Sequence, residues 1–344
     1  MKRCPTKKVI TTELVNLFAC ILITSPLLAH ARLRRLPIFG ISHVAFDVSN
    51  LSKARAFYES FLGFQKYGVL RREDGSIQGV QENGVLLPDD GSIRMVFIKV
   101  NNLQHIELFV AQPPPGRGRL NHVAFYTNNA EQMRDYLASR GVKVPQRVGK
   151  GKSGDLNFMI EDNEGHRVEI VQCEPGGWVM RDRGKFMSAG RISRHIMHMG
   201  FPVGSLQRSM QFYQGILGFH EFWRGSANGR ILSWVDMRVP NGQDYVEFML
   251  YGGRYPSLRQ LGGMEHFCLE VPDVHRAVAE LESRPAFKTY GRKITVSLGH
   301  NHHWLANLFD ADGTRIELME PRTYNGKPVP PSTAPPPVGP DEKP

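Results

Sequence analysis

The chain contains four copies of one sequence pattern, and this repeat limits the folds that it can adopt. Residues 41–64 read ISHVAFDVSNLSKARAFYESFLGF, and residues 196–219 read IMHMGFPVGSLQRSMQFYQGILGF. Shorter versions of the same pattern occupy residues 120–143 and 264–284. Internal self-similarity indicates that one structural unit is used several times. The chain is therefore predicted to build its core from four related modules.

Each copy predicts an α+β module that runs strand, helix and then about three further strands, written βαβββ. After the opening strand, apolar residues recur at helical spacing, which gives the helix one buried face. Gly63 and Gly218 stand directly after two of these helices, where glycine commonly ends a helix. The copies close with four similar strands, LQHIELFV (103–110), HRVEIVQ (166–172), DYVEFML (244–250) and TRIELME (314–320).

The strand phase places four histidines and four glutamates on one side of the predicted sheets, because alternate residues of a strand face opposite sides. The histidines are His43, His122, His198 and His266, and the glutamates are Glu107, Glu169, Glu247 and Glu317. Two residues after each histidine the same face carries a small residue, namely Ala45, Ala124, Gly200 or Cys268. Small neighbours leave open space in front of the sheet. A half-buried carboxylate is costly unless it is paired or binds a metal.

Metal binding has to be weighed against an ordinary structural role. A single strand histidine or glutamate is usually a satisfied core or surface residue, and the copies of a repeat are not independent observations. An inherited pattern whose metal has been lost in one or both halves is therefore the alternative. The sequence has no cysteine pair at metal-thiolate spacing, so histidine and carboxylate side chains would supply the ligands.

These features resemble the vicinal oxygen chelate superfamily, which includes glyoxalase I, extradiol ring-cleaving dioxygenases, and fosfomycin and bleomycin resistance proteins. The resemblance rests on the repeated module, the histidine of its first strand, the FYxxxLGF pattern, the DADG turn at 310–313 and the closing glutamate. It covers residues 41–320. It implies a glyoxalase/dioxygenase-like fold in which the modules pair into two open half-barrels, each around one metal position.

The connecting segments divide the chain. Modules one and two are expected in a domain over residues 38–175, and modules three and four in a second domain over residues 193–322. Residues 176–192 are the predicted linker between them. Residues 323–344 are rich in proline and are expected to form a disordered tail.

The resemblance also implies metal ligands. A chain of four modules is similar to the extradiol dioxygenases, whose C-terminal pair of modules holds Fe(II) or Mn(II), and the matching residues here are His198, His266 and Glu317. A glyoxalase-like site would add Glu247 as a fourth ligand or base. The second candidate set lies in the N-terminal half and consists of His43, Glu107, His122 and Glu169. Fe(II) is favoured because two histidines and one carboxylate leave positions open for substrate oxygens and O₂. Mn(II), Zn(II) and Ni(II) are the alternatives.

Three further residues are candidates for catalysis. His300 falls near the place where extradiol dioxygenases keep a histidine for proton transfer. Tyr245 and Arg315 precede Glu247 and Glu317 by two residues and therefore share the pocket face. Arg315 could hold a substrate carboxylate in a bidentate contact, or it could orient the neighbouring glutamate ligand.

Asn307 stands where the extradiol signature has a substrate-polarising tyrosine, which weakens the case for catechol cleavage. Three functions are therefore open. The leading one is an exported, metal-dependent oxidoreductase similar to the extradiol dioxygenases, acting on a small aromatic or enediol substrate with vicinal oxygens. The second is a glyoxalase-like isomerase or lyase. The third is a protein that binds a small molecule without turnover.

Charge and the N-terminus bear on partners and location. The formal net charge is +10, but Lys and Arg are scattered, so a nucleic-acid partner is not expected. Residues 1–31 combine basic residues, an apolar stretch at 14–28 and the sequence AHA at 29–31, which predicts a cleaved signal peptide and export. An uncleaved anchor is the alternative, and after cleavage no membrane span is expected. The sequence leaves open the oligomeric state and whether Cys173 and Cys268 pair.

Overall fold

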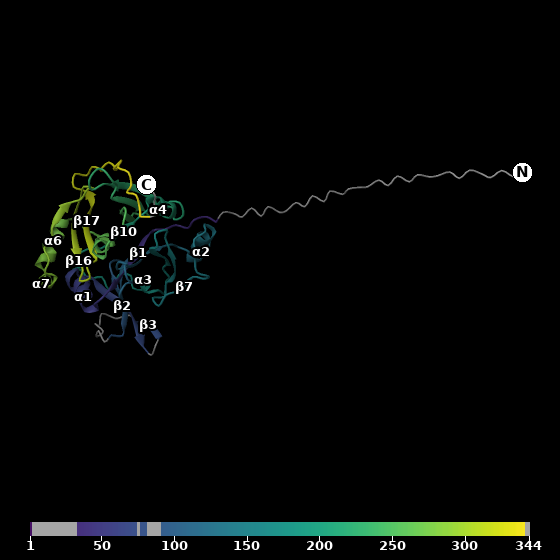
Figure 1. Cartoon of the computed structure of the whole chain (residues 1–344). Coiled ribbons are helices and arrows are strands. Elements are labelled where there is room, and N and C mark those ends of the chain that lie inside the picture. Colours follow the sequence, from purple (N-terminus) through teal and green to yellow (C-terminus); the bar gives the residue numbers. More distant parts are fainter. Residues whose placement is uncertain (2–32, 74–75, 81–90, 341–344) are drawn as a thin grey trace. The chain divides into compact units, whose positions relative to one another are not determined.

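The computed structural model describes residues 1, 33–73, 76–80 and 91–340, which form two mixed β-sheets (Figure 1). The N-terminal sheet has nine strands in the order β3-β2-β4-β5-β1-β6-β9-β8-β7. The C-terminal sheet has eight strands in the order β11-β12-β13-β10-β14-β17-β16-β15. The predicted signal peptide lies outside the described residues apart from Met1, so its cleavage stays a prediction.

The N-terminal half contains the first two modules. Its strands are β1 (Gly40–Val48), β2 (Gln65–Glu73), β3 (Ser76–Val80), β4 (Ile93–Lys99), β5 (His105–Val110), β6 (Leu120–Tyr126), β7 (Gly149–Lys150), β8 (Leu156–Glu161) and β9 (Arg167–Gln172). Its helices are α1 (Leu51–Arg55), the π-helical turn η1 (Ala56–Phe61), α2 (Ala130–Ser139) and α3 (Trp178–Arg181). The first module thus has one more strand than expected, β3, which pairs with β2 at the edge of the sheet.

The C-terminal half contains the third and fourth modules. Its strands are β10 (Ile196–Val203), β11 (His220–Gly225), β12 (Trp234–Arg238), β13 (Tyr245–Leu250), β14 (His266–Glu270), β15 (Val296–Leu298), β16 (His303–Phe309) and β17 (Arg315–Thr323). Its helices are α4 (Leu206–Tyr213), α5 (Leu258–Met264), α6 (Val274–Ser283) and α7 (Phe287–Tyr290). The predicted fold of four βαβββ modules in two sheets is confirmed.

The local signals at the helix ends explain where each module turns. In all four modules a polar residue caps the helix, and its side chain accepts a hydrogen bond from the backbone N–H three residues later. These caps are Asn50, Asn129, Ser205 and Asp273. Gly63 and Gly218 adopt φ values of 77° and 73°, which glycine reaches without the steric cost of a side chain.

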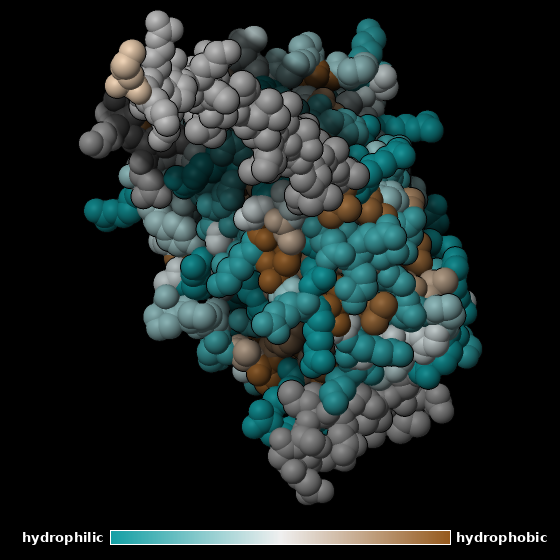
Figure 2. All heavy atoms as spheres, turned by 90° about the vertical axis from the view of Figure 1, so that its right-hand side faces the viewer, coloured by the Kyte–Doolittle hydropathy of each residue, from teal (hydrophilic) through white to brown (hydrophobic). Residues whose placement is uncertain are grey.

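The predicted strand phase is confirmed by the different surroundings of alternate residues, because the side assigned to packing belongs to the hydrophobic core while the histidine rings converge on the other side. The side assigned to packing is fully buried: Val44, Phe46, Val123, Phe125, Met199, Phe201, Phe267 and Leu269 each have 0% exposure. The helices cover this side, and the histidine side is left facing the hollow of each sheet. On the outer face shown in Figure 2, hydrophobic side chains occur as small separate groups among hydrophilic ones.

Two buried tyrosines connect the halves through the turn motifs. Tyr58 donates a hydrogen bond to the Asp310 carboxylate at 3.2 Å, and Tyr213 donates to the Asp162 carboxylate at 3.0 Å. Each aspartate also accepts two backbone N–H groups of its own turn. The helix of module one therefore contacts the turn of module four, and the helix of module three contacts the turn of module two. The aspartate turns lie at residues 161–165 and 310–313, so each helix that carries the FY pair contacts the aspartate turn of the other half.

The two connecting segments are both ordered against the sheets. The linker includes the short helix α3, whose Trp178 is 7% exposed. The Pro-rich tail was expected to be disordered, whereas its backbone makes hydrogen bonds from Ser332 N to Arg224 O and from Leu232 N to Pro335 O. A third bond runs from Gly253 N to Val338 O. Proline leaves its carbonyl free to accept, so an extended Pro-rich segment can attach to loops in this way.

Cys173 and Cys268 are both free thiols, so they do not form the disulfide that the sequence left open. Within the described residues, no helix has the length and apolar character that crossing a bilayer requires.

A charged network lies where the first strands of the two halves meet. His195 Nε2 is 2.8 Å from Asp244 Oδ1, and His195 Nδ1 is 2.8 Å from Glu270 Oε2. The other Asp244 oxygen accepts the N–H of Ile41 in β1 at 2.8 Å. Burial lowers the pKa of His195, but the hydrogen bonds and negative charges of Asp244 and Glu270 outweigh it and raise the pKa to about 9. A protonated His195 thus supports the junction of the two halves.

We expect this network to make stability depend on pH. Because the pKa of His195 is raised in the folded state, its contribution is complete below pH 6.5 and is lost as the pH rises through about 9. The free energy of unfolding should fall by about 1–2 kcal/mol over this range, a modest amount because His195 and Glu270 are partly exposed to solvent. Urea unfolding of the wild type and of His195→Gln at pH 6 and pH 10 measures it. The difference in the free energy of unfolding between wild type and His195→Gln should be smaller at pH 10 than at pH 6.

His220→Gln is the matched control, because His220 is an exposed histidine of β11. It should leave the pH dependence of the wild type unchanged. An equal pH dependence in wild type and His195→Gln would contradict the role assigned to the network.

Candidate metal centres

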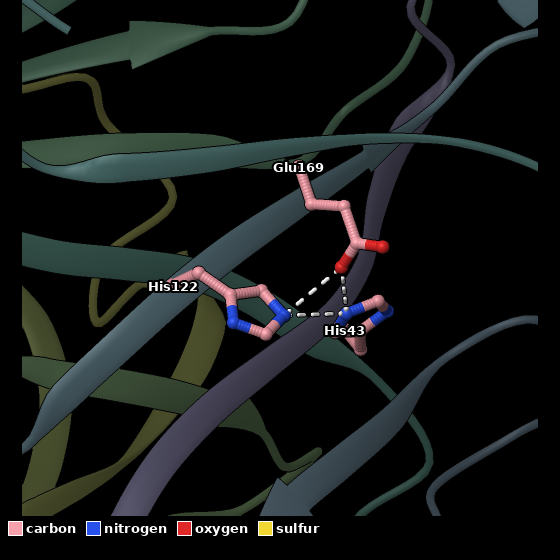
Figure 3. Close-up of side chains that lie close together, drawn as sticks. All are labelled: His43, His122 and Glu169. Carbon is pink, nitrogen blue, oxygen red and sulfur yellow. Dashed lines mark hydrogen bonds and ion pairs between the residues drawn. The ribbon is translucent and has the colours of Figure 1, made fainter. Parts of the chain in front are cut away.

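Four ligand-type side chains converge at the centre of the N-terminal sheet. The Nε2 atoms of His43 and His122 are 3.0 Å apart, and each lies 3.0 Å from Glu169 Oε2 (Figure 3). Glu107 Oε2 lies 3.6 Å from His43 Nε2 and 3.5 Å from His122 Nε2. All four residues are at most 8% exposed. The predicted set of His43, Glu107, His122 and Glu169 is therefore brought together.

Strand register produces this convergence. The opening strands β1 and β6 pair antiparallel, with Ala45 opposite His122 and His43 opposite Ala124. On the outer sides, Ala45 is also paired with Glu107 of β5, and Ala124 with Glu169 of β9. Each ligand row thus has an alanine at its centre, which leaves room for the imidazole that leans over it.

The C-terminal sheet repeats the arrangement. His198 Nε2 is 3.1 Å from His266 Nε2 and 3.3 Å from Glu317 Oε2, while His266 Nε2 is 3.2 Å from Glu247 Oε2. Gly200 and Cys268 occupy the positions of the two alanines. A Cβ atom at Gly200 would lie 1.9 Å from His266 Cε1, so only glycine allows the ring to lie there. The set of His198, Glu247, His266 and Glu317 also converges.

Both sets fit a divalent ion. Two ligand atoms that each lie about 2.1 Å from one ion, at right angles to one another, are about 3.0 Å apart. The observed separations of 3.0–3.7 Å need only small side-chain movements. Outer contacts orient the rings, because His122 Nδ1 lies 2.9 Å from Asn121 Oδ1 and His266 Nδ1 lies 2.9 Å from Met264 O. These contacts present Nε2 to the centre.

The carboxylates are held in the charged form that binds metals. Burial raises the pKa of Glu317, but the hydrogen bond of His198 and the charge of Arg315 outweigh it and hold the pKa at about 2. Burial likewise raises the pKa of Glu169, and its hydrogen bonds with His122 and His43 outweigh it and lower the pKa far below the usual range.

One cavity opens onto the C-terminal centre, and a second lies beside it. One, of about 290 Å³, is lined by His198, Glu247 and Glu317 together with Arg315, His300 and Asn307. A larger one, of about 590 Å³, is lined by Tyr245, Trp223, Asp236 and Arg238 among others. Of the three predicted catalytic residues, His300 and Arg315 line the cavity at this centre, while Tyr245 lines the neighbouring one and packs against His198 with ring centroids 4.6 Å apart. Their roles stay predictions. Nε of Arg315 and Oδ1 of Asn307 are buried and have no hydrogen-bond partner among the described residues.

Sequence comparison assigns the family. The model of the glyoxalase/bleomycin resistance protein/dioxygenase superfamily matches residues 40–170 and 195–318, which cover most of the chain and contain both centres. The chain belongs to this superfamily. Its similarity to Saccharomyces cerevisiae glyoxalase I is 24% identity over 234 residues, 60% of this chain, and it spans 64% of the length of that relative.

Solved structures of the superfamily share the fold. Homoprotocatechuate 2,3-dioxygenase of Brevibacterium fuscum is 18% identical, with a TM-score of 0.58 over 89% of this chain and 87% of that chain. The 2,3-dioxygenase LapB of Pseudomonas sp. KL28 is 14% identical, with a TM-score of 0.59 over 86% and 98%. An Mn(II)-bound glyoxalase of Novosphingobium aromaticivorans is 15% identical, with a TM-score of 0.57 over 83% of both chains. At these identities the likeness establishes the fold alone.

Sequence reasoning missed two residues of this superfamily member's C-terminal centre. Asp236 of β12 is opposite Glu247 in the sheet and is 3% exposed, and burial together with the charge of Glu247 raises its pKa well above the usual range. Trp223 lines both cavities, and its buried Nε1 has no partner within the described part of the chain. A signal existed for Asp236, which is flanked by Val235 and Met237 just as Glu247 is flanked by apolar residues.

We expect Gly200→Ala to impair metal binding at the C-terminal centre. The added Cβ would displace the His266 ring, and misplaced ligands typically cost about 10- to 100-fold in metal affinity. Isothermal titration with Mn(II) after chelator treatment measures the change. Gly263→Ala is the control, because a Cβ there meets nothing within 4 Å. Unchanged affinity in Gly200→Ala would show that the ion does not use His266.

Proposed function

We propose that the C-terminal half is a metal-dependent enzyme that moves a proton on a small substrate with two neighbouring oxygen atoms, as a glyoxalase-like isomerase or lyase does. The observation that carries the proposal is the fourth ligand. Glu247 lies 3.2 Å from His266 Nε2 and completes a set of two histidines and two glutamates. The same set of residue types recurs in the N-terminal half.

The number of ligands distinguishes the two reaction types. Two histidines and one carboxylate would leave room for a chelating substrate and for O₂. A fourth protein ligand would reduce the open positions of a six-coordinate ion to two, which two substrate oxygens could fill. The set therefore favours a reaction that needs no oxygen.

The residues around the cavity can perform the remaining tasks. A divalent ion bound there would polarise a substrate carbonyl and stabilise the charge that develops on it. The Glu247 side chain is the most exposed of the four C-terminal ligand candidates at 13%. One of its carboxylate oxygens could bind the ion, while the other accepts a proton from the carbon beside the carbonyl and returns it to the neighbouring atom. Arg315 and Asn307 offer unpartnered polar atoms that can hold the substrate.

A dioxygenase is the second candidate. His198, His266 and Glu317 form by themselves the triad of two histidines and a carboxylate, and His300 lines the same cavity, where it could transfer a proton. Asn307, opposite Glu317 in the sheet, stands against catechol chemistry because an amide is a weaker acid than the expected tyrosine. Fe(II) would be the cofactor in this case, and Mn(II), Zn(II) or Ni(II) would serve the isomerase.

Dependence on oxygen separates the two candidates. We expect turnover of α-oxoaldehyde–thiol adducts or related enediol precursors to continue without O₂ and with Zn(II) or Ni(II) as the metal. Glu247→Gln should lower kcat by about 10²- to 10⁴-fold, because it removes the proton acceptor. Glu282→Gln, an exposed change on α6, is the control.

Oxygen uptake during turnover of a catechol, and loss of activity under nitrogen, would instead establish the dioxygenase. If neither substrate class reacts while a ligand stays tightly bound, the protein is a binding protein.

We also propose that the enzyme is exported. The support is the basic, apolar and small-residue pattern of residues 1–31. N-terminal sequencing of the protein from its native host should find Arg32 as the first residue. Finding residues 1–31 still attached to the protein would refute cleavage.

A further inference from the structure

The larger cavity of the C-terminal half has a counterpart position in the N-terminal half. Its wall includes Phe222, Trp223, Asp236 and Tyr245. Strand pairing aligns Trp223 with Asp236 and Asp236 with Glu247 in one half. The corresponding row of the other half runs from Gly68 through Phe97 to Glu107. The two halves can therefore be compared residue by residue at this place.

In the N-terminal half the linker fills this place. The ring of Trp178 lies directly on Gly68, where a Cβ would be 2.2 Å from Trp178 Cζ3. Trp178 also packs edge-on against Phe97 and Tyr67, at centroid distances of 5.3 and 6.4 Å. His105 lies between these aromatics and the centre, with its ring stacked 4.6 Å from that of His43. An aromatic cluster thus stands where the other half has its large cavity.

Polar contacts fix the linker in this position. The N–H of Trp178 donates to Ser153 O at 2.8 Å, and the N–H of Gly184 donates to Asn102 Oδ1 at 2.7 Å. The buried ammonium of Lys99 donates to Asp182 O. The linker is therefore held against the N-terminal half by hydrogen bonds at several points along its length.

The C-terminal tail is the corresponding segment of the other half, because it follows β17 as the linker follows β9. It contributes Gly326, Pro328 and Val329 to the wall of the 590 Å³ cavity. It supplies no aromatic side chain to that wall and leaves the cavity open. Of the two equivalent extensions, the linker thus covers this side of the N-terminal centre, whereas the tail frames an open cavity beside the C-terminal centre.

We propose that the N-terminal centre holds its divalent ion as a structural site covered by Trp178 and releases it slowly, whereas the C-terminal centre exchanges metal rapidly and alone admits substrate. Both centres offer the same four ligand types, so the surroundings and not the number of ligands distinguish them; structural metal sites are closed, whereas catalytic sites keep an open position. The apolar shell around a site also controls the access of solvent and competitors. Four buried ionisable groups whose neighbouring donor atoms are 3.0–3.6 Å apart are costly without an ion, so this ion would stabilise the N-terminal half.

The two centres should release metal at different rates. The intact protein is loaded with Zn(II) at both centres, mixed with excess 4-(2-pyridylazo)resorcinol, and followed by absorbance. Release should show a fast and a slow phase that differ at least about ten-fold in rate. His266→Ala should remove the fast phase, and His122→Ala should remove the slow phase. His122→Ala should also lower the Tm of the Zn(II)-loaded protein more than His266→Ala does.

Opening the linker should affect the slow phase alone. Trp178→Ala removes the covering ring, and Gly68→Ala displaces it sterically, so each should accelerate slow release about ten-fold. Phe222→Ala is the matched control, because Phe222 corresponds to Tyr67 but is 39% exposed at the open cavity. It should leave the slow phase unchanged.

Single-phase release would overturn the proposal, as would a slow phase that persists in His122→Ala or that both linker variants leave unchanged. The assignment of turnover to the C-terminal centre rests on the proposed function. The release rates and the Tm do not depend on turnover, so failure of the enzymatic proposal and failure of this one are distinguishable.

Discussion

The antiparallel pairing of opening strands is the constraint on which both centres depend. β1 pairs with β6, and β10 pairs with β14, so that each histidine lies opposite a small residue of the neighbouring strand. The closing strands then pair in parallel on the outer sides and add one glutamate to each row. A shift of the pairing by one residue would turn every one of these side chains to the packed face. Register therefore decides whether this family member can bind metal at all.

The two halves share one arrangement of metal-ligand residues but differ in the residues that surround it. Ligand spacing is nearly the same in both, with the paired Nε2 atoms 3.0 and 3.1 Å apart. The difference lies in the segment that extends beyond the last strand of each half. An aromatic linker residue packs against Gly68 in one half, whereas Trp223 stands at the corresponding place in the other and borders two cavities. A repeated module can thus keep its metal-ligand residues, while the segments outside the module determine whether solvent and substrate reach the centre.

The sequence predicted the four modules and their ligand residues better than it predicted the linker and the C-terminal tail. His43, His122, His198 and His266 could be placed on one face because strand periodicity is local, and apolar neighbours marked the four glutamates in the same way. Composition predicts a domain linker at residues 176–192 and a disordered tail at residues 323–344. Composition alone could not show that the Trp178 ring packs on Gly68. It also could not show that the carbonyls of Pro335 and Val338 accept hydrogen bonds from the N–H groups of Leu232 and Gly253.

The sequence by itself determined the four modules, the phase of the ligands and the helix ends, since each of these depends on residues close together in the chain. The approach of histidine and glutamate donors to 3.0–3.7 Å, the placing of Asp236 beside Glu247 and the covering of one centre by the linker were decided only by the tertiary structure. These features join residues that are far apart in the sequence. Their geometry depends on strand register and on which surface each segment packs against, and neither is encoded in any single stretch of the chain.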